Sequence, residues 1–443
     1  MDIAPDQFLN GTLSTTVGEA CVNDNPIQLP IIEASLMEQV LDRNNLARAL
    51  KQVKRNKGAA GVDGMTTEQL SAYLHVHWPD LKECLIDGRY RPQAVRRVEI
   101  PKADGKMRKL GIPTVIDRFI QQAIAQIISA LWEPTFHPNS YGFRPQRNAQ
   151  QAVRHAQNTI VNGKSWVIDL DLQAFFDTVN HDRLMARLKT RIQDRTLLKL
   201  VRRYLTSPIQ KDGQITANRE GVPQGGPLSP ILANIVLDEL DWELEKRGHC
   251  FSRYADDCQI YVGSRRAAER IKTSVQRYIE DHLRLKVNED KSAVDRPWKR
   301  SFLGFTVSPR RGNRIKVADK ALVKLKQRVR ELSRRTRGHH LSYVIADLRK
   351  YLLGWKAYFG VAEVQSPLRD IDKWIRRKLR CYIWKQWGRS GYRKLRRLGV
   401  DRWTAWNTAK SAHGPWRISK SPALYRALPN RYFKGLGLPS LAA

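Results

Sequence analysis

The feature of this sequence that most constrains its fold is a change in hydrophobic pattern after residue 308. Up to that point, short runs with a two-residue period alternate with stretches whose apolar residues recur every three or four positions. From residue 315 onward only the helical spacing remains, over residues 322–332, 345–359 and 368–382. The pattern therefore predicts an α+β region followed by an all-α region that forms a small bundle.

The expected elements and domains follow from this pattern and from the turn residues. The elements of the α+β region are helices over 34–55, 117–134, 184–205 and 266–283, a hairpin over 95–113 that turns at Asp104-Gly105, a β pair over 251–262, and strands over 166–172 and 302–307. The domains are an acidic, poorly ordered lead over 1–35, a mixed region over 36–308, a helical domain over 315–388 and a basic tail over 389–443, beyond the glycines at 388 and 391.

Charge indicates the kind of partner. The chain has 78 Lys and Arg against 43 Asp and Glu, a net charge of +35. Residues 310–443 alone hold 34 of these cations and only 7 acids, a net of +27. Such a surface attracts phosphate backbones and releases their counterions, so a nucleic acid is the expected partner.

Other classes of protein are excluded by what the sequence lacks. It contains no run of 18 apolar residues and no lipidation motif, so no membrane partner is expected. Its five Cys show no C-x-x-C spacing, which argues against a disulfide framework and a structural zinc module. Residues 1–42 carry seven acids and no Lys or Arg, unlike a signal peptide, so a cytoplasmic protein is expected.

Two acidic strings offer candidate metal ligands. In "RYADDCQIYV", Asp256 and Asp257 stand in the turn of the expected β pair, and adjacent carboxylates that repel each other favour a hard divalent cation. Taken alone, a solvated acidic turn explains them equally well. In "DLDLQAFFD", Asp169 and Asp171 end a strand and share one of its faces, so spacing does not choose between them. Carboxylates from separate strands that converge on two metals are what phosphoryl transfer by a metal pair requires.

Two further segments are suited to nucleotides. In "GVPQGGPLSP", glycines and prolines surround Gln224 ahead of an apolar helix, and such a loop can bring its backbone close to a ligand. The expected hairpin carries Lys102 and Arg108, two cations suited to a triphosphate. Without the other motifs, an ordinary tight turn and two solvated cations would explain these residues.

The order of the motifs resembles a known family. The strings "IPKADGKMRKLGIPTVIDR", "SYGFRP", "DLQAFFD", "PQGGPLSP", "YADD", "NEDKS" and "FLGF" resemble the successive blocks of a reverse transcriptase. "NKGAAGVDGMT" before them and "YLLGWKAYFG" after them are similar to the reverse transcriptase/maturases of bacterial group II introns. The final segment, from "HGPWRISK" onward, resembles members without an HNH endonuclease. The resemblance covers about residues 40–443.

The resemblance implies a right-hand fold, with fingers and palm over 36–308, a thumb/maturase domain over 315–388 and a DNA-binding role for the basic tail over 389–443. For the metal site, it implies two Mg²⁺ ions in the palm. Asp171 matches the ligand on the palm strand, because the family's aromatic residue follows five positions later, at Phe176. Asp256 and Asp257 complete the implied catalytic and metal-binding triad.

For the nucleotide, the resemblance implies further roles. Phe176 matches the residue whose ring excludes a ribose 2′-hydroxyl, Lys102 and Arg108 match the finger cations on the triphosphate, and Gln224 matches the loop residue at the incoming nucleotide. Lys291 occupies the basic position of the sixth block, with a role that the resemblance specifies less well.

The implied function is an RNA-directed DNA polymerase that binds its group II intron RNA, assists splicing and copies the intron into a DNA target, using dNTPs and associating with the nucleoid. Because the Cys and His pairs of the endonuclease are missing, we expect no second-strand cleavage and a primer from a host replication fork. One alternative is a domesticated reverse transcriptase in phage defence or DNA repair. Another is a splicing chaperone that binds RNA and has a vestigial polymerase.

Overall fold

The computed structural model describes residues 35–101, 105, 107–222, 225–310, 312–336 and 338–442. All elements below belong to the unit Leu36–Ala443. The expected roles of Lys102 and Gln224 and the expected lead over 1–35 fall on residues outside this description, apart from Ser35.

The expected single helix over 34–55 is wrong, because the structure has two helices there. Helix α1 (Leu36–Val40) ends before Asp42, whose side chain accepts hydrogen bonds from the backbone N–H groups of Asn44 and Asn45. This N-cap begins α2 (Arg43–Asn56) in a new direction. Helix α3 (Leu70–Ile86) follows.

The expected hairpin over 95–113 is confirmed as part of a four-stranded sheet. Strand β1 pairs antiparallel with β2, with Val98 opposite Leu110, and parallel with β4 on its other side. The strand order is β2-β1-β4-β5. The elements are β1 (Val95–Pro101), β2 (Met107–Ile112), β4 (Ile209–Lys211), β5 (Gln214–Thr216), and the helix α4 (Val115–Trp132) with the 3₁₀ turn Glu133–Thr135.

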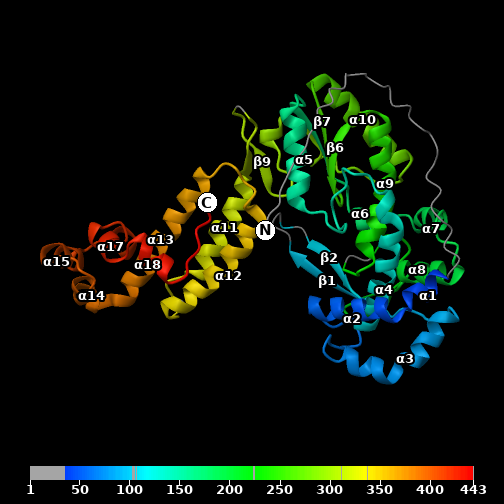
Figure 1. Ribbon diagram of the computed structural model, residues 1–443, viewed down its shortest axis with the longest axis horizontal. Helices are drawn as coiled ribbons and strands as arrows, with labels where there is room; N and C mark the ends of the chain where they lie inside the picture. The colour runs from blue at the N-terminus through cyan, green and yellow to red at the C-terminus, as the bar shows by residue number, and fades with distance from the viewer. Residues whose placement is uncertain are drawn as a thin grey trace, which may run out of the picture. The chain divides into compact units, whose positions relative to one another are not determined.

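A second sheet, entirely antiparallel, has the order β6-β7-β3-β8. Its alternating side chains enter two different cores: Val167 and Tyr261 pack with α5, whereas Ile168 and Ile260 pack with α9 and α10. Both faces of the sheet are thus covered, as Figure 1 shows. The elements are β3 (Trp166–Leu170), β6 (Cys250–Tyr254), β7 (Asp257–Val262), β8 (Ala293–Asp295), α5 (Ala149–Val161), α9 (Ser229–Lys246) and α10 (Arg265–Asp281).

The expected helix over 184–205 is likewise divided. The structure has two helices there, α7 (His181–Lys189) and α8 (Arg195–Leu205). Asp194 is the N-cap of α8, and its carboxylate accepts a hydrogen bond from the N–H of Leu197. Its other oxygen accepts from the N–H of Met37, which ties α8 to α1. A single-turn helix, α6 (Phe175–Thr178), precedes this pair.

Beyond the second sheet the chain forms a two-stranded ribbon and then only helices, so the predicted change of pattern is confirmed. The elements are η2 (Pro297–Lys299), β9 (Phe305–Val307), β10 (Ile315–Val317), α11 (Asp319–Leu332), α12 (Leu341–Phe359), α13 (Ser366–Trp387), η3 (Gly388–Ser390), α14 (Gly391–Arg397), α15 (Arg402–Lys410), α16 (Pro415–Ile418), α17 (Pro422–Ala427) and α18 (Asn430–Gly435). In the described part of the chain, no helix is long and apolar enough to span a membrane.

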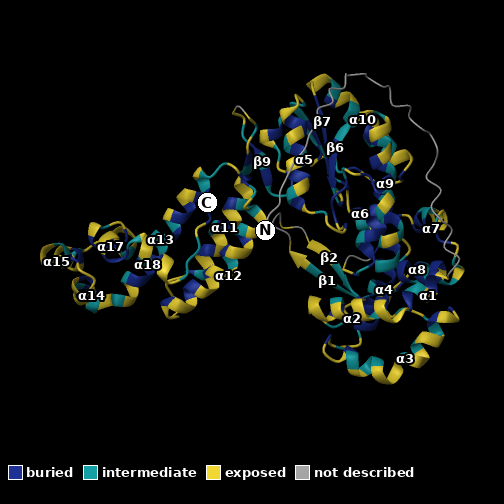
Figure 2. Cartoon of the chain, viewed as in Figure 1, coloured by how far each residue is buried: buried dark blue, intermediate teal, exposed yellow. Residues whose placement is uncertain are grey.

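The boundary expected at residue 388 is not a packing boundary. Leu379 of α13 shares one hydrophobic core with Leu395, Leu424 and Phe433, which lie beyond it. The carboxylate of Asp372 in α13 also accepts hydrogen bonds from the backbone N–H groups of residues 441 and 442. Figure 2 shows buried residues within these last helices, so residues 389–442 are folded onto α13 rather than forming a separate tail.

Candidate active site

The β3–β7 pairing brings the candidate carboxylates to one end of the second sheet. Asp169 pairs with Gln259 and residue 170 with residue 258, so Asp171 leaves β3 beside the start of β7 at Asp257. Tyr254 pairs with Asp257, which leaves a two-residue turn of Ala255, at φ +57°, and the exposed Asp256. Asp171 and Asp257 line one cavity of about 570 Å³, together with Asp169.

The electrostatics of this end of the sheet favour a cation. Burial and the negative charges of Asp169, Asp256 and Asp171 together raise the pKa of Asp257 to about 8. The available donors are carboxylate oxygens, the ligands that hard divalent metals prefer. Among the described residues, no group of three or more His, Cys, Asp or Glu is arranged to hold a metal ion. In donor chemistry, the carboxylates nevertheless fit a divalent cation.

The contacts in the structure distinguish Asp169 from Asp171, which the spacing of the two residues alone did not. Asp169 accepts a hydrogen bond of 3.1 Å from the side-chain amide of Gln259, and its other oxygen lies 3.8 Å from the Arg300 guanidinium. The side chain of Asp171 is 45% exposed in the cavity, with the Lys291 ammonium 3.6 Å away. Asp169 therefore has a hydrogen-bond partner and is 22% exposed, whereas the carboxylate of Asp171 is the more exposed of the two and pairs with the Lys291 ammonium.

The "NEDKS" segment fixes the backbone of Asp171. The N–H of Asn288 donates to the Asp171 carbonyl at 2.8 Å, and the Asp171 N–H donates to the Ser292 hydroxyl at 3.0 Å. Lys291 lies between these two anchors and is 49% exposed. Its ammonium is thus placed beside the candidate metal ligand.

The structure places Phe176 against the glycine-rich loop. Phe176 is half-buried, with its ring 5.1 Å from the buried ring of Phe175 in an edge arrangement. The N–H of Val222 donates to the Phe176 carbonyl at 2.6 Å. Gly221, at φ +86°, brings its backbone so close that a Cβ would lie 2.7 Å from that same carbonyl oxygen. Gly221 and Val222 are therefore anchored to the backbone of Phe176.

Arg108 is distant from the candidate carboxylates in the sequence and belongs to a different sheet. It belongs to β2, opposite Ile100, and its side chain is exposed. The structure thus puts this cation on the hairpin of the first sheet, and the carboxylates at the end of the second.

A residue that the sequence analysis missed holds the acidic turn. The guanidinium of Arg253 is buried and donates to both carboxylate oxygens of Asp241, at 2.7 and 2.5 Å. It also donates to the side chains of Asn234 and Ser140, at 3.1 and 2.8 Å, and to the Ala255 carbonyl in the turn, at 2.9 Å. All five N–H groups are used. An arginine inside an apolar strand was the signal that could have revealed it.

The "SYGFRP" segment supports the same turn. The N–H of Tyr141 donates to the Arg253 carbonyl at 2.9 Å. A Cβ on Gly142 would lie 2.3 Å from the Ala255 backbone nitrogen, so only glycine permits this approach. The Arg144 guanidinium donates to the Ser140 carbonyl at 2.8 Å. This segment is therefore a backbone brace for the acidic turn.

An antiparallel sheet with converging carboxylates at its end, preceded by a separate hairpin sheet and followed by a helical domain, defines the class of nucleic-acid polymerases with fingers, palm and thumb. Comparison with known proteins specifies the family. Residues 100–307 match the family described as reverse transcriptase (RNA-dependent DNA polymerase), and residues 322–403 match the group II intron, maturase-specific domain.

Two curated relatives, Protein YkfC and LtrA, agree with this assignment. The chain is similar to Protein YkfC of Escherichia coli (strain K12), with 35% identity over 56% of this chain and 76% of that protein. It is similar to the group II intron-encoded protein LtrA of Lactococcus lactis subsp. cremoris, with 28% identity over 61% of this chain, and spans 56% of LtrA's length. A solved telomerase structure from Candida albicans aligns with a TM-score of 0.42 and 14% identity, over 67% of this chain and 60% of that one.

The chain belongs to the reverse transcriptases, the RNA-directed DNA polymerases, and carries a group II intron maturase domain. The predicted α+β fold of fingers and palm followed by a helical maturase domain is confirmed. Enzymes of this family use divalent metals. The individual roles of Asp171, Asp256, Asp257, Phe176 and Lys291 stay predictions.

Proposed function

We propose that this protein is the reverse transcriptase/maturase of a group II intron, which assists splicing of the intron RNA and copies it into DNA at a target site. The observation that carries this proposal is the succession of two domains in one chain: a reverse transcriptase region over residues 100–307 and a maturase-specific region over 322–403. A polymerase that copies an unrelated template has no need of a maturase-specific region.

In the proposed chemistry, Asp171, Asp256 and Asp257 hold two Mg²⁺ ions. The ions, when bound, lower the pKa of the attacking 3′-hydroxyl and stabilise the charge of the transferring phosphoryl group. Asp171 and Asp257 present their carboxylates to one cavity, and the Lys291 ammonium moderates the negative charge at Asp171 from 3.6 Å. Burial and the neighbouring carboxylates raise the pKa of Asp257 to about 8, so binding of a cation, which favours the carboxylate, would release its proton.

The nucleotide is positioned by residues outside this acidic cluster. Phe176, whose backbone carbonyl accepts from the N–H of Val222, excludes a ribose 2′-hydroxyl by contact with its half-buried ring. Lys102 and Arg108 bind the triphosphate, and Gln224 contacts the incoming nucleotide; these roles come from the matching motifs.

The proposed macromolecular partners are the intron RNA and a target DNA, and the proposed setting is the nucleoid. The excess of cations over residues 310–443 supports binding to phosphate backbones. We also propose that the primer comes from a host replication fork. The test uses a duplex target labelled on each strand, incubated with the ribonucleoprotein and Mg²⁺. We expect insertion of RNA into one strand, whereas a protein-dependent cut in the other strand would contradict the proposed primer source.

The experiment that tests the function combines two assays on one preparation. Primer extension uses an RNA template with an annealed DNA primer and dNTPs, and splicing uses a transcript of the adjoining intron. We expect both activities. Extension without any effect on splicing would favour a domesticated reverse transcriptase, and splicing without extension would favour an RNA chaperone; either outcome would overturn the proposal.

A further inference from the structure

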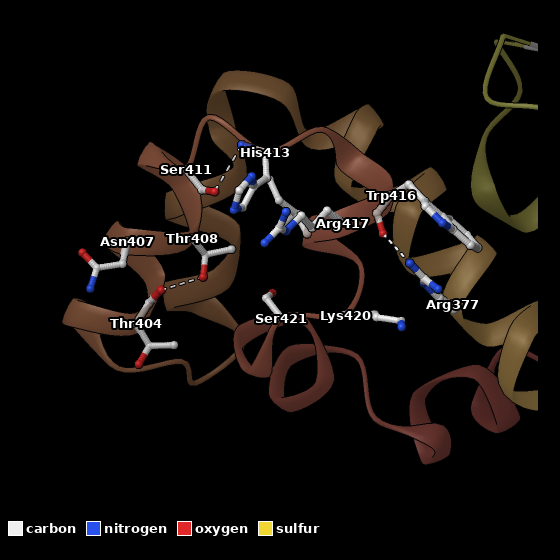
Figure 3. Close-up of a pocket in the computed structure, with 11 residues that line it drawn as sticks. Arg377, Thr404, Asn407, Thr408, Ser411, His413, Trp416, Arg417, Lys420 and Ser421 are labelled. Carbon is white, nitrogen blue, oxygen red and sulfur yellow. Dashed lines mark hydrogen bonds between the residues drawn. The ribbon is translucent and has the colours of Figure 1, made fainter.

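A cavity of about 780 Å³ lies in the last helices, away from the candidate metal site (Figure 3). Residues of α13, α15 and α16 line it, together with the segment 411–413 and with Lys420 and Ser421 just before α17. We call it the C-terminal cavity. Neither the metal site nor the proposed nucleotide contacts involve it.

The charged side chains that line the C-terminal cavity are all cations. Arg377, Arg417 and Lys420 are among its eleven lining residues, and none of the eleven is Asp or Glu. Side-chain hydroxyls and one amide complete the wall, from Thr404, Asn407, Thr408, Ser411 and Ser421. Cations combined with such donors are suited to a phosphate group and the sugar attached to it.

An aromatic ring in the wall adds a stacking surface. The Arg377 guanidinium carbon lies 3.7 Å from the centroid of the Trp416 ring, a close cation–π contact. Trp416 nevertheless keeps 40% of its surface exposed. Figure 3 shows Trp416 beside Arg377, with the dashed line marking the hydrogen bond of 3.1 Å from the guanidinium to the Trp416 carbonyl.

Hydrogen bonds hold the backbone at Trp416. The buried Ser419 donates its hydroxyl to the Trp416 carbonyl at 2.6 Å and accepts from Arg377 at 3.3 Å. Ile418, which precedes Ser419, is buried in the core shared with α13. The Arg377 guanidinium covers one face of the ring, so a base would stack on the opposite face.

We propose that the C-terminal cavity binds one unpaired nucleotide of a nucleic-acid strand. The base stacks on Trp416, and Arg417 and Lys420 bind the adjoining phosphate. A base within a duplex covers its own faces with its neighbours, so only an unpaired one offers a face to the ring. The inference rests on the proposed role of this protein in binding RNA and DNA, and it adds the kind of strand that the last helices recognise.

The first test is strand binding by the full chain. Fluorescence anisotropy would measure its affinity for labelled oligonucleotides: single-stranded DNA, single-stranded RNA and a blunt duplex. Trp416→Ala should weaken single-strand binding by about five- to a hundredfold, the usual effect of losing one stacked base. Trp416→Phe should retain most of the affinity, which also shows that the fold survives. Comparison of the DNA and RNA arms identifies which strand the cavity prefers.

A matched control is available in the same segment. Trp403 is 73% exposed in α15 and is not among the residues that line the cavity. Trp403→Ala should therefore change single-strand affinity by no more than about twofold, well below the loss of a stacked base. Equal losses for Trp416→Ala and Trp403→Ala would overturn the proposal, as would an equal loss of duplex binding by Trp416→Ala.

The phosphate contact is tested by salt dependence. Arg417→Gln should reduce the slope of log affinity against log salt by about 0.7 for single strands if it removes one phosphate contact. Arg402→Gln, which removes the same charge from an exposed position outside the cavity, should change the slope less. Equal changes would mean that only the overall charge matters and would contradict a phosphate contact in the cavity.

Failure of this inference can be separated from failure of the proposed function. Primer extension and splicing are measured on the same wild-type preparation. If the wild type is active but Trp416→Ala binds single strands normally, the cavity assignment is wrong and the reverse transcriptase/maturase remains. If Trp416→Ala loses single-strand affinity although the wild type neither extends nor splices, the proposed function is wrong and the cavity remains.

Discussion

The buried guanidinium of Arg253 gives a prediction that connects folding to the geometry of the acidic turn. The perturbation is Arg253→Met, which preserves most of the apolar volume and removes all five donors. Asp241, whose side chain is fully buried, would then keep its charge with no cationic partner. The Ala255 carbonyl would also lose its hydrogen bond to the guanidinium.

The magnitude follows from the contacts. Removal of one partner of a buried ion pair costs about 3–5 kcal/mol, because the remaining charge is desolvated and uncompensated. If this is the main cost, the double variant Arg253→Met/Asp241→Leu should recover most of it, to within about 2 kcal/mol of the wild type. Arg265→Gln is a matched control, because its ion pair with Glu269 is 70% and 57% exposed and contributes about 0–1 kcal/mol.

The assay is amide hydrogen exchange of the peptides that cover β6 and β7, which reports the local free energy of unfolding. Primer extension is measured on the same proteins. The double variant should fold but extend primers about ten- to a hundredfold more slowly, because the turn at Ala255 is no longer fixed.

Two results would refute this reasoning. A single variant destabilised by less than about 1 kcal/mol would mean that the ion pair is not the buried constraint that its geometry indicates. A double variant with the full extension rate would mean that Arg253 supports the fold without positioning the turn.

Three further predictions concern the gate, a buried acid and the last helices. Phe176→Ala should raise ribonucleotide incorporation relative to deoxynucleotide incorporation in primer extension, and an unchanged ratio would place the gate elsewhere. Asp238 is buried, and desolvation raises its pKa to about 6. The folded protein therefore favours the protonated carboxyl, whose contribution to the free energy of unfolding is complete below about pH 4 and is lost as the pH rises through about 6. Asp238→Asn should therefore raise the denaturation midpoint at pH 7 and leave it unchanged at pH 4. Truncation after Trp387 should make α11–α13 protease-sensitive, since it removes Leu395 and Phe433 from their shared core; a protease-resistant fragment would contradict this.

Much of the fold could be predicted from the sequence because the elements are long and periodic. The hairpin at β1–β2 and the three helices α11–α13 follow from spacing and turn residues. The breaks at Asp42 and Asp194 were missed, because each is a single polar residue whose side chain caps the next helix. The boundary at residue 388 was misplaced because glycines mark a turn in the chain and do not show which helices share a core.

In the candidate site, too, the sequence did not predict the contacts between distant segments. Motif order located the carboxylates, and strand register brought Asp171 and Asp257 to one cavity. Spacing did not separate Asp169 from Asp171, because both lie on one face, and only the contacts with Gln259 and Arg300 distinguish them. Arg253 was missed because its side-chain partners Asp241, Asn234 and Ser140 lie on other segments, 12 to 113 residues away in the sequence.

The measurement that tests the central claim most directly is primer extension on an RNA template by Asp171→Asn and Asp169→Asn, side by side. Both substitutions remove one negative charge from the same face of β3. We expect Asp171→Asn to lower the rate by several orders of magnitude, because positioning of metal ions carries most of phosphoryl transfer. Asp169→Asn should keep most of the activity, since an amide oxygen can still accept from Gln259. Full activity of Asp171→Asn, or equal loss in both variants, would contradict the assignment of this site.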